Sequence, residues 1–247
     1  MTLGREQILR EMGLGPLWKL RAVSSSIEAV AAPVPPAPAP MHTPAVAKVA
    51  LAATVTAPHA GMTWDELATA VAACRQCRLC EARKQAVLGV GDRAGDWLFV
   101  GEGPGAEEDQ CGEPFVGQAG KLLDNMLAAI GLKRGQDVYI ANAVKCRPPE
   151  NRTPAPEEMV ACRPYLQRQI ELIQPKLIVA LGRPAAQTLL QAEVKIAAAR
   201  GKLHDYHGIP LIISYHPAYL LRTLLDKAKA WEDLCFMRRT MAARKGG

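Results

Sequence analysis

The stretch DWLFVGEGPG, residues 96–105, joins an apolar run to a glycine-rich end. The run from Trp97 to Val100 contains no charged or amide side chain, which is typical of a strand buried on both faces of a sheet. The glycines after it allow a ligand to approach the backbone closely, and their amides can bind an anion or the polar edge of a base. The stretch therefore predicts a central strand that ends at a binding loop.

Similar apolar runs recur along the chain and alternate with helical patterns. Strands are predicted over residues 138–144, 176–182 and 210–217, and helices over residues 118–130, 156–173 and 184–191. Continuous apolar strands separated by helices indicate a parallel sheet that is covered on both faces. We therefore expect a three-layer α/β/α fold around a central, mostly parallel four-stranded sheet, with ligands bound at the carboxyl ends of the strands.

The composition of the 247 residues is that of a globular protein, with 49% hydrophobic and 22% charged residues. No apolar run is long enough to span a membrane, and the charged N-terminal stretch lacks the apolar centre of a secretory signal. We therefore expect a cytoplasmic protein without membrane contact. Seven cysteines in a reducing compartment favour a metal site, redox chemistry or buried thiols over disulfides. The net charge of +6 is compatible with a polyanionic partner but does not identify one.

Three regions follow one another along the chain. Residues 1–21 form a short amphipathic segment, and residues 5–21 are expected to dock onto a partner protein, unless they are a tail with incidental helicity. Residues 22–61 hold 13 alanines and 7 prolines and no Phe, Tyr or Trp, so they cannot form a core. We predict a disordered linker over residues 22–62 and a folded, monomeric domain over residues 63–247.

Five of the seven cysteines fall into two groups with metal-ligand spacing. Cys74, Cys77 and Cys80 form a C-x2-C-x2-C motif, and Cys146 and Cys162 are each followed by Arg-Pro. Two thiolates from one turn and two from elsewhere complete four soft ligands, which suit either a 4Fe–4S cluster or a Zn²⁺ ion. The spacing leaves open which pair of the triplet binds, and buried structural thiols are the alternative. The other two cysteines are isolated and are expected to be free thiols.

Three residues at or near the predicted strand ends are candidates for ligand binding. Phe115 lies in a loop, where its ring could stack on a planar group. Asn142 interrupts an apolar strand, and its amide could read the edge of a pyrimidine or purine. His216 ends the last predicted strand. Each of the three also fits a structural role, as a core side chain or as a group bonded to buried backbone.

Taken together, several stretches resemble the family 4 uracil-DNA glycosylases, the iron–sulfur class of these enzymes. The matching stretches, in chain order, are GEGPGAEED, PFVGQAG, YIANAVKCRPPENR, IVALG, RGKLH and HPAYLLR. They span about residues 73–239, which is nearly the whole predicted domain. Their joint order and spacing carry the resemblance, since each motif alone is weak.

The resemblance implies catalytic roles in the first and last of these motifs. Glu102 is similar to an acid near the sugar, and His216 resembles the histidine that binds uracil O2. Gly103 occupies the position where related enzymes often place an Asp that orients the attacking water, so Glu102 or a backbone carbonyl must hold this water. Glu108 aligns with a residue that rejects thymine by crowding its C5 methyl group. Ala106 departs from the Glu of many members, although three acids follow it.

Further matches imply how uracil and DNA are bound. Phe115 resembles the aromatic residue that stacks on uracil, and Asn142 resembles the amide that reads the pyrimidine edge. Leu220 or Leu221 would fill the gap that a flipped nucleotide leaves, and Arg222 would hold a phosphate.

The resemblance also implies a structural 4Fe–4S cluster, with Zn²⁺ as the alternative occupant. It assigns four ligands to the cluster: Cys74, Cys77, Cys146 and Cys162. Cys80 is not among them. Basic residues around the second pair of ligands would face DNA phosphates: Lys145, Arg147, Arg152 and Arg163.

The activity that the resemblance implies is DNA repair on uracil-containing DNA, and the expected partner of residues 5–21 is then a replication or repair protein. The enzyme would flip uracil out of DNA, hydrolyse its N-glycosidic bond and leave an abasic site. Two alternatives stay open at this point. The domain could be a non-catalytic, Fe–S- or Zn-stabilised module that binds uracil or single-stranded DNA, or the chain could be an interaction protein in which the Pro/Ala-rich tail matters most.

Overall fold

The computed structural model describes residues 59 and 61–245. The predicted docking segment over residues 1–21 and most of the predicted linker over residues 22–62 lie outside the described residues. At the end of that linker, the ring of His59 stacks on Tyr165 with 4.2 Å between centroids, and the Met62 carbonyl accepts a hydrogen bond from Arg168 Nε. The packed domain therefore begins before Thr63. No helix in the described part of the chain is long and apolar enough to cross a membrane.

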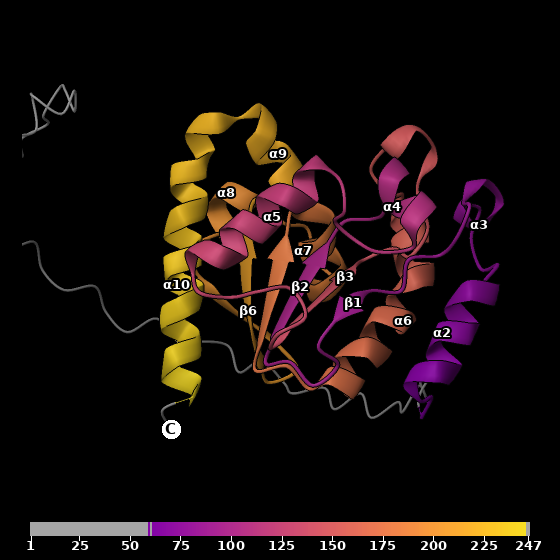
Figure 1. The fold of residues 1–247 in the computed structure, drawn as a ribbon, viewed down its shortest axis with the longest axis horizontal. Helices are drawn as coiled ribbons and strands as arrows, with labels where there is room; N and C mark the ends of the chain where they lie inside the picture. Colours follow the sequence, from indigo (N-terminus) through magenta and orange to yellow (C-terminus); the bar gives the residue numbers. More distant parts are fainter. Residues whose placement is uncertain (1–58, 60, 246–247) are drawn as a thin grey trace, which may run out of the picture. The chain divides into compact units, whose positions relative to one another are not determined.

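A six-stranded sheet forms the middle layer of the fold, in the order β1–β3–β2–β4–β6–β5 (Figure 1). The strands span Val90–Gly91 (β1), Trp97–Gly101 (β2), Val138–Asn142 (β3), Leu177–Leu181 (β4), Leu203–Tyr206 (β5) and Ile209–Ser214 (β6). The four predicted strands β3, β2, β4 and β6 are parallel to one another and form the centre of the sheet. The two edge strands, β1 and β5, are antiparallel additions that the sequence analysis missed.

The two edge strands lack the sequence pattern from which the central strands were predicted. β1 has only two residues, which is too short for a periodic pattern. β5 is the polar stretch LHDY, and only its last residue, Tyr206, is buried. Edge strands are paired on one side only and need no continuous apolar run, unlike the fully buried strands of the centre.

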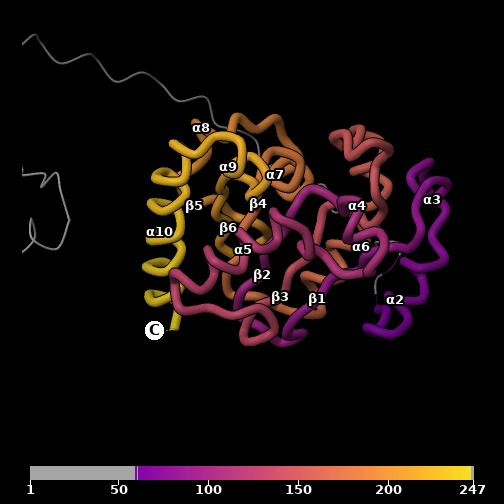
Figure 2. The backbone as a smooth tube through the Cα atoms, turned by 45° about the horizontal axis from the view of Figure 1, so that its top comes forward, coloured from indigo at the N-terminus to yellow at the C-terminus, as the bar shows by residue number. Residues whose placement is uncertain are grey.

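Helices cover both faces of the sheet, which confirms the predicted three-layer α/β/α fold (Figures 1 and 2). The helices are α2 (Trp64–Ala73), α3 (Leu79–Ala82), α4 (Ala106–Cys111), α5 (Gln118–Ala129), α6 (Pro156–Ile173), α7 (Arg183–Leu190), α8 (Ile196–Ala199), α9 (Pro217–Arg222) and α10 (Lys227–Lys245). Two short 3-10 turns, η1 (Pro149–Asn151) and η2 (Leu224–Asp226), lie between them. α5 and α10 pack on one face, where Trp97 and Phe99 of β2 point, and α6 and α7 pack on the other, where Leu98 and Val100 point.

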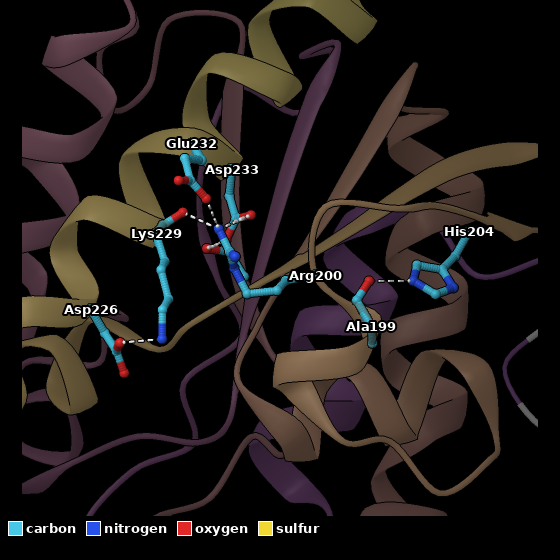
Figure 3. Close-up of polar contacts among 8 residues, drawn as sticks. Ala199, Arg200, His204, Asp226, Lys229, Glu232 and Asp233 are labelled. Atoms are coloured by element: carbon cyan, nitrogen blue, oxygen red, sulfur yellow. Dashed lines mark hydrogen bonds and ion pairs between the residues drawn. The ribbon is translucent and has the colours of Figure 1, made fainter. Parts of the chain in front are cut away.

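A buried polar network fixes α10 to the sheet near the end of β6 (Figure 3). The Asp233 carboxylate of α10 is 1% exposed and accepts hydrogen bonds from Ser214 Oγ at 2.8 Å and from Arg200 Nε at 3.1 Å. The Arg200 guanidinium also contacts Glu232 at 3.0 Å and the Lys229 carbonyl. Through Asp233, the network joins Arg200, which follows α8, to α10 and to Ser214 of β6. Ser214 precedes His216 by two residues.

This network can be tested by comparing two cations drawn in Figure 3. Replacing Arg200 by Met leaves the buried Asp233 carboxylate without its cation, and we expect the unfolding free energy to fall by about 3 kcal/mol. Lys229→Met is the matched control, because it removes only the exposed partner of Asp226, 2.9 Å away, and should leave stability near that of the unchanged protein. Urea unfolding measures both variants, and equal losses would contradict the anchoring role of the network.

Candidate functional site

A cavity of about 860 Å³ lies at the carboxyl ends of the four parallel strands. Each strand contributes to its wall, with Glu102 after β2, Asn142 at the end of β3, Gly182 after β4 and His216 after β6. Most of the predicted site residues lie on this wall: Glu102, Gly103, Glu108, Phe115, Asn142, His216 and Arg222. Segments more than 100 residues apart in the sequence therefore meet in one cavity, as expected for a parallel sheet.

Two aromatic side chains face each other in the wall. The rings of Phe115 and His216 are 5.4 Å apart between centroids, and their planes differ by 30°. Close packing around Phe115 depends on Gly101, since a Cβ there would lie 2.5 Å from both Phe115 Cζ and Asn142 Oδ1. The glycine at the end of β2 is thus required to place the ring and the amide side by side.

Asn142 presents an unused acceptor to the cavity. The residue is 2% exposed, and its Oδ1 atom has no hydrogen-bond partner among the described residues. Its backbone carbonyl, in contrast, accepts a hydrogen bond from Lys145 Nζ at 2.8 Å. A buried amide that lacks a partner costs free energy, and most buried polar groups in proteins are paired. The Asn142 Oδ1 atom is therefore placed to accept a hydrogen bond from a ligand that carries a donor.

His216 caps α9 and is fixed in one tautomer by this contact. The backbone N–H of Ala218 donates to His216 Nδ1 at 3.2 Å, so the neutral ring carries its proton on Nε2. The pKa of His216 is lowered to about 4, mainly by burial and also by the charge of Arg222, while the charge of Glu108 opposes the shift. At neutral pH the ring is therefore uncharged and offers an Nε2–H donor.

The loop after β2 holds an acid with a shifted pKa. Burial raises the pKa of Glu102, while a hydrogen bond with Thr153 and the charge of Arg183 oppose the shift. Beside it, a Cβ on Gly103 would lie 2.7 Å from Val144 Cγ2. An Asp at this position would therefore have to displace Val144, which gives the glycine a packing reason.

Glu108 is bound to the backbone of two loops. Its carboxylate accepts hydrogen bonds from the N–H groups of Gly105 at 3.0 Å, Val116 at 2.9 Å and Gly117 at 3.1 Å. The side chain lines the cavity, but its oxygens join the loop after β2 to the loop that carries Phe115. The sequence analysis did not anticipate this contact, because residues 108 and 116 approach each other only in the folded chain.

The two leucines proposed to contact DNA differ in exposure. Leu220 is 1% exposed and packs in the core against the α5 and α10 face of the sheet. Leu221 is 41% exposed, and Arg222 next to it is exposed at the cavity wall. Leu220 is therefore not positioned for contact with DNA, and of the two leucines it is Leu221 that is accessible.

A second cavity, beside α2, α3 and α6, gathers five cysteines: Cys74, Cys77, Cys80, Cys146 and Cys162. Cys146 and Cys162 are buried, and the other three are half-buried. As the side chains stand, no three His, Cys, Asp or Glu residues of the described chain converge closely enough to hold a single metal ion. The isolated cysteines Cys111 and Cys235 do not line this cavity.

In the second cavity, burial opposes the ionisation of two cysteine thiols, and nearby N–H donors favour it. Burial raises the pKa of Cys162 to about 12 and also raises that of Cys146, so a bare thiolate would be unfavourable at either. Arg83 Nη1 donates to Cys146 Sγ at 2.8 Å, and the Lys145 N–H donates to Cys162 Sγ at 3.2 Å. Both contacts favour the charged form of the sulfur. The thiol donors, together with these N–H groups, fit a thiolate-bound metal centre.

Two basic residues of this region were missed or misplaced by the sequence analysis. Lys145 is 1% exposed and bonds Asn142 and Gln169, so the prediction that it faces DNA phosphates is wrong. Arg83 donates to the carbonyls of Ala72 and Cys74 as well as to Cys146. A single Arg three residues after a cysteine motif carries no sequence signal for such a contact.

Comparisons with known proteins cover this part of the chain. Residues 88–235 match the family model described as Uracil DNA glycosylase superfamily. The chain is 47% identical over 165 residues to the type-4 uracil-DNA glycosylase of Archaeoglobus fulgidus, a match that covers 64% of this chain and 82% of the relative. It is 49% identical over 151 residues to that of Thermotoga maritima (60% and 78% covered), and 45% identical over 172 residues to that of Pyrobaculum aerophilum (65% and 86% covered). The region matched by the family model includes the whole wall of the larger cavity.

The environment of His216 leads to a prediction about its protonation. In an NMR titration, the imidazole should titrate near pH 4 and carry its proton on Nε2 at neutral pH. Because this pKa lies below the ordinary value of 6.5, the neutral ring stabilises the folded state above pH 6.5, and this contribution is lost as the pH falls from 6.5 towards 4. The variant His216→Asn should lack this part of the pH dependence of stability. A midpoint near the ordinary value would contradict the prediction.

Proposed function

The chain belongs to the uracil DNA glycosylase superfamily and to its type-4 branch, and from this premise we propose that the larger cavity binds and excises uracil from DNA. The chain is a DNA-repair hydrolase that acts on an N-glycosyl bond. The observation that carries the proposed site is the buried Asn142 amide, whose Oδ1 atom has no partner among the described residues and which lies beside Phe115 and His216.

Asn142 supplies the selection for uracil. A base inside a duplex is out of reach, so the nucleotide is flipped into the cavity, where the base stacks against Phe115. Asn142 Oδ1 accepts the N3–H of uracil, and the amide N–H donates to O4. Cytosine carries the opposite pattern at these two atoms and would leave both groups unpaired, and discrimination of this kind can reach about 10⁴-fold.

His216 supplies the stabilisation of the leaving group. When the N-glycosidic bond breaks, the sugar gains oxocarbenium character and the uracil gains negative charge at O2. The neutral His216 ring donates its Nε2–H to this oxygen, and backbone N–H groups of the loop after β2 add to the same effect. The donor is fixed before the reaction because the Ala218 N–H holds the other ring nitrogen.

Glu102 is the group that we assign to the attacking water. It follows the last residue of β2 and lies on the cavity wall beside Gly103. The packing of Gly103 against Val144 leaves no room for an acid at position 103. Its hydrogen bond with Thr153 and the charge of Arg183 favour the carboxylate form against the effect of burial. A carboxylate can orient a water towards C1′ as the sugar gains positive charge.

DNA contacts outside the cavity are assigned to exposed residues near its wall. Leu221 fills the space that the flipped nucleotide leaves in the base stack, and Arg222 holds a phosphate. Arg183 is exposed on the same wall and can neutralise a further phosphate. Arg152 is exposed there too, but its guanidinium is already paired with the Glu158 carboxylate at 2.7 Å. For Glu108 we retain the role of crowding the C5 methyl group of thymine. Its carboxylate oxygens bind backbone N–H groups, and its side chain lines the cavity.

We assign the second cavity to a structural 4Fe–4S cluster held by Cys74, Cys77, Cys146 and Cys162, with Zn²⁺ as the alternative occupant of the same thiolates. All four of these cysteines line the second cavity, and Cys146 and Cys162 are buried in it. The bound group would supply no reaction chemistry. It would fix the segments that carry Asn142 and Lys145.

The first experiment is a base-release assay on an oligonucleotide with one dU, with the matched dT oligonucleotide as control. Uracil should be released and the abasic product cleaved by alkali, while the dT oligonucleotide stays intact. His216→Ala should lower the excision rate by about 10²–10³-fold and retain binding, because one donor to the leaving group is lost. Binding without release by the unchanged, metal-loaded protein would instead favour a non-catalytic uracil-binding module.

The metal assignment is tested by the iron and zinc content of purified protein. Cys146→Ser should lose the bound metal and, for a cluster, its visible absorption, because a buried thiolate ligand is removed. Cys111→Ser is the matched control, since Cys111 is exposed and does not line the second cavity. Full metal content in Cys146→Ser would contradict the ligand set.

A further inference from the structure

Phe115 is held in a backbone conformation that aromatic residues rarely adopt. Its φ angle is 57°, in the left-handed region that favours glycine. Such a conformation is strained and persists only where the surroundings impose it. Phe115 is 6% exposed, and its ring stacks against His216. The residue with the strained backbone is therefore also the one that supplies the aromatic ring of the cavity wall.

Arg134 holds this backbone from outside the cavity. Its Nη1 donates to the Pro114 carbonyl and its Nη2 to the Phe115 carbonyl, both at 2.8 Å. The planar guanidinium with fixed donors suits two successive carbonyls in a way that a lysine ammonium does not. Arg134 does not line the cavity, and its remaining contact is with Asp124, at 3.0 Å from Nε.

The peptide after Phe115 is held at both of its polar ends. Its carbonyl accepts from Arg134, while its N–H, which belongs to Val116, donates to Glu108 at 2.9 Å. Helix α5 passes so close that a Cβ on Gly120 would lie 1.8 Å from the Phe115 carbonyl oxygen. The carbonyl therefore lies between the helix and Arg134, and the glycine at position 120 makes this close approach possible.

We propose that Arg134 is a positioning residue that holds Phe115 in its left-handed conformation and so sets the ring in place for the flipped base. This inference rests on the proposed function of the cavity. Without Arg134, the two carbonyls on either side of the φ torsion of Phe115 lose their shared donor, and only Glu108 still holds the N–H of Val116. Phe115 then relaxes towards a negative φ, and the ring leaves its place beside His216.

The kinetic test compares three variants on the dU oligonucleotide. Arg134→Met keeps the length of the side chain without its donors, and we expect kcat/KM to fall about 10- to 100-fold, as for other small misplacements of a substrate-binding group. Arg134→Lys should recover part of this loss. Asp124→Asn is the matched control, because it removes the exposed ion pair of Arg134 but leaves both carbonyl bonds, and it should retain the unchanged rate.

A double-mutant cycle separates positioning from a general loss of stability. If Arg134 acts through the Phe115 ring, Arg134→Met should cause little further loss of kcat/KM in a Phe115→Leu background. Losses that multiply in the double variant would overturn the proposal, because they would mean that Arg134 acts independently of the ring.

An NMR measurement decides the matter without any turnover. The Phe115 ring shifts the ring-proton resonances of His216, since the two rings are stacked. In Arg134→Met these resonances should move towards their positions in Phe115→Leu, and in Asp124→Asn they should stay. Unchanged His216 resonances in Arg134→Met would overturn the positioning role. Failure of the unchanged protein to release uracil would instead overturn the proposed function, and the resonances would still decide the role of Arg134.

Discussion

The parallel pairing of β2 with β3 is the constraint on which the rest of the site depends. Its register sets Gly101 opposite Asn142, and the missing side chain of Gly101 leaves room for the Asn142 amide and the Phe115 ring at 2.5 Å from where a Cβ would be. The same sheet brings the end of β6, with His216 after it, to the same edge. A shift of one residue in this register would turn the amide to the opposite face.

Several residues of the site are held in energetically unfavourable states by contacts with other parts of the fold. The Asn142 oxygen is buried without a partner in the described chain, His216 is held neutral, and Phe115 has a left-handed backbone. Glu108 and Arg134 hold the loop around Phe115 from two sides. Such a site is organised before a ligand arrives, which spares the ordering of these groups on binding.

Lys145 connects the two cavities physically. Its Nζ donates to the Asn142 carbonyl at 2.8 Å, and its backbone N–H donates to Cys162 Sγ at 3.2 Å. Gln169 Oε1 accepts from the same Nζ, and Gln169 Nε2 donates to the Leu88 carbonyl and the Tyr139 hydroxyl. The Lys145 ammonium is thus part of a buried hydrogen-bond chain. Lys145 therefore links a cysteine of the second cavity to the residue proposed to read the base.

The sequence by itself determined the four central strands and the three-layer class, because buried parallel strands leave continuous apolar runs. It also indicated several residues of the cavity wall, through their positions at strand ends and through the family resemblance. It could not separate Leu220 from Leu221, since only the packing of α9 buries one and exposes the other. It also misplaced Lys145 and did not anticipate Arg134. Cations that bond distant carbonyls leave no periodic pattern, so only the tertiary structure decided which charges are buried and what they hold.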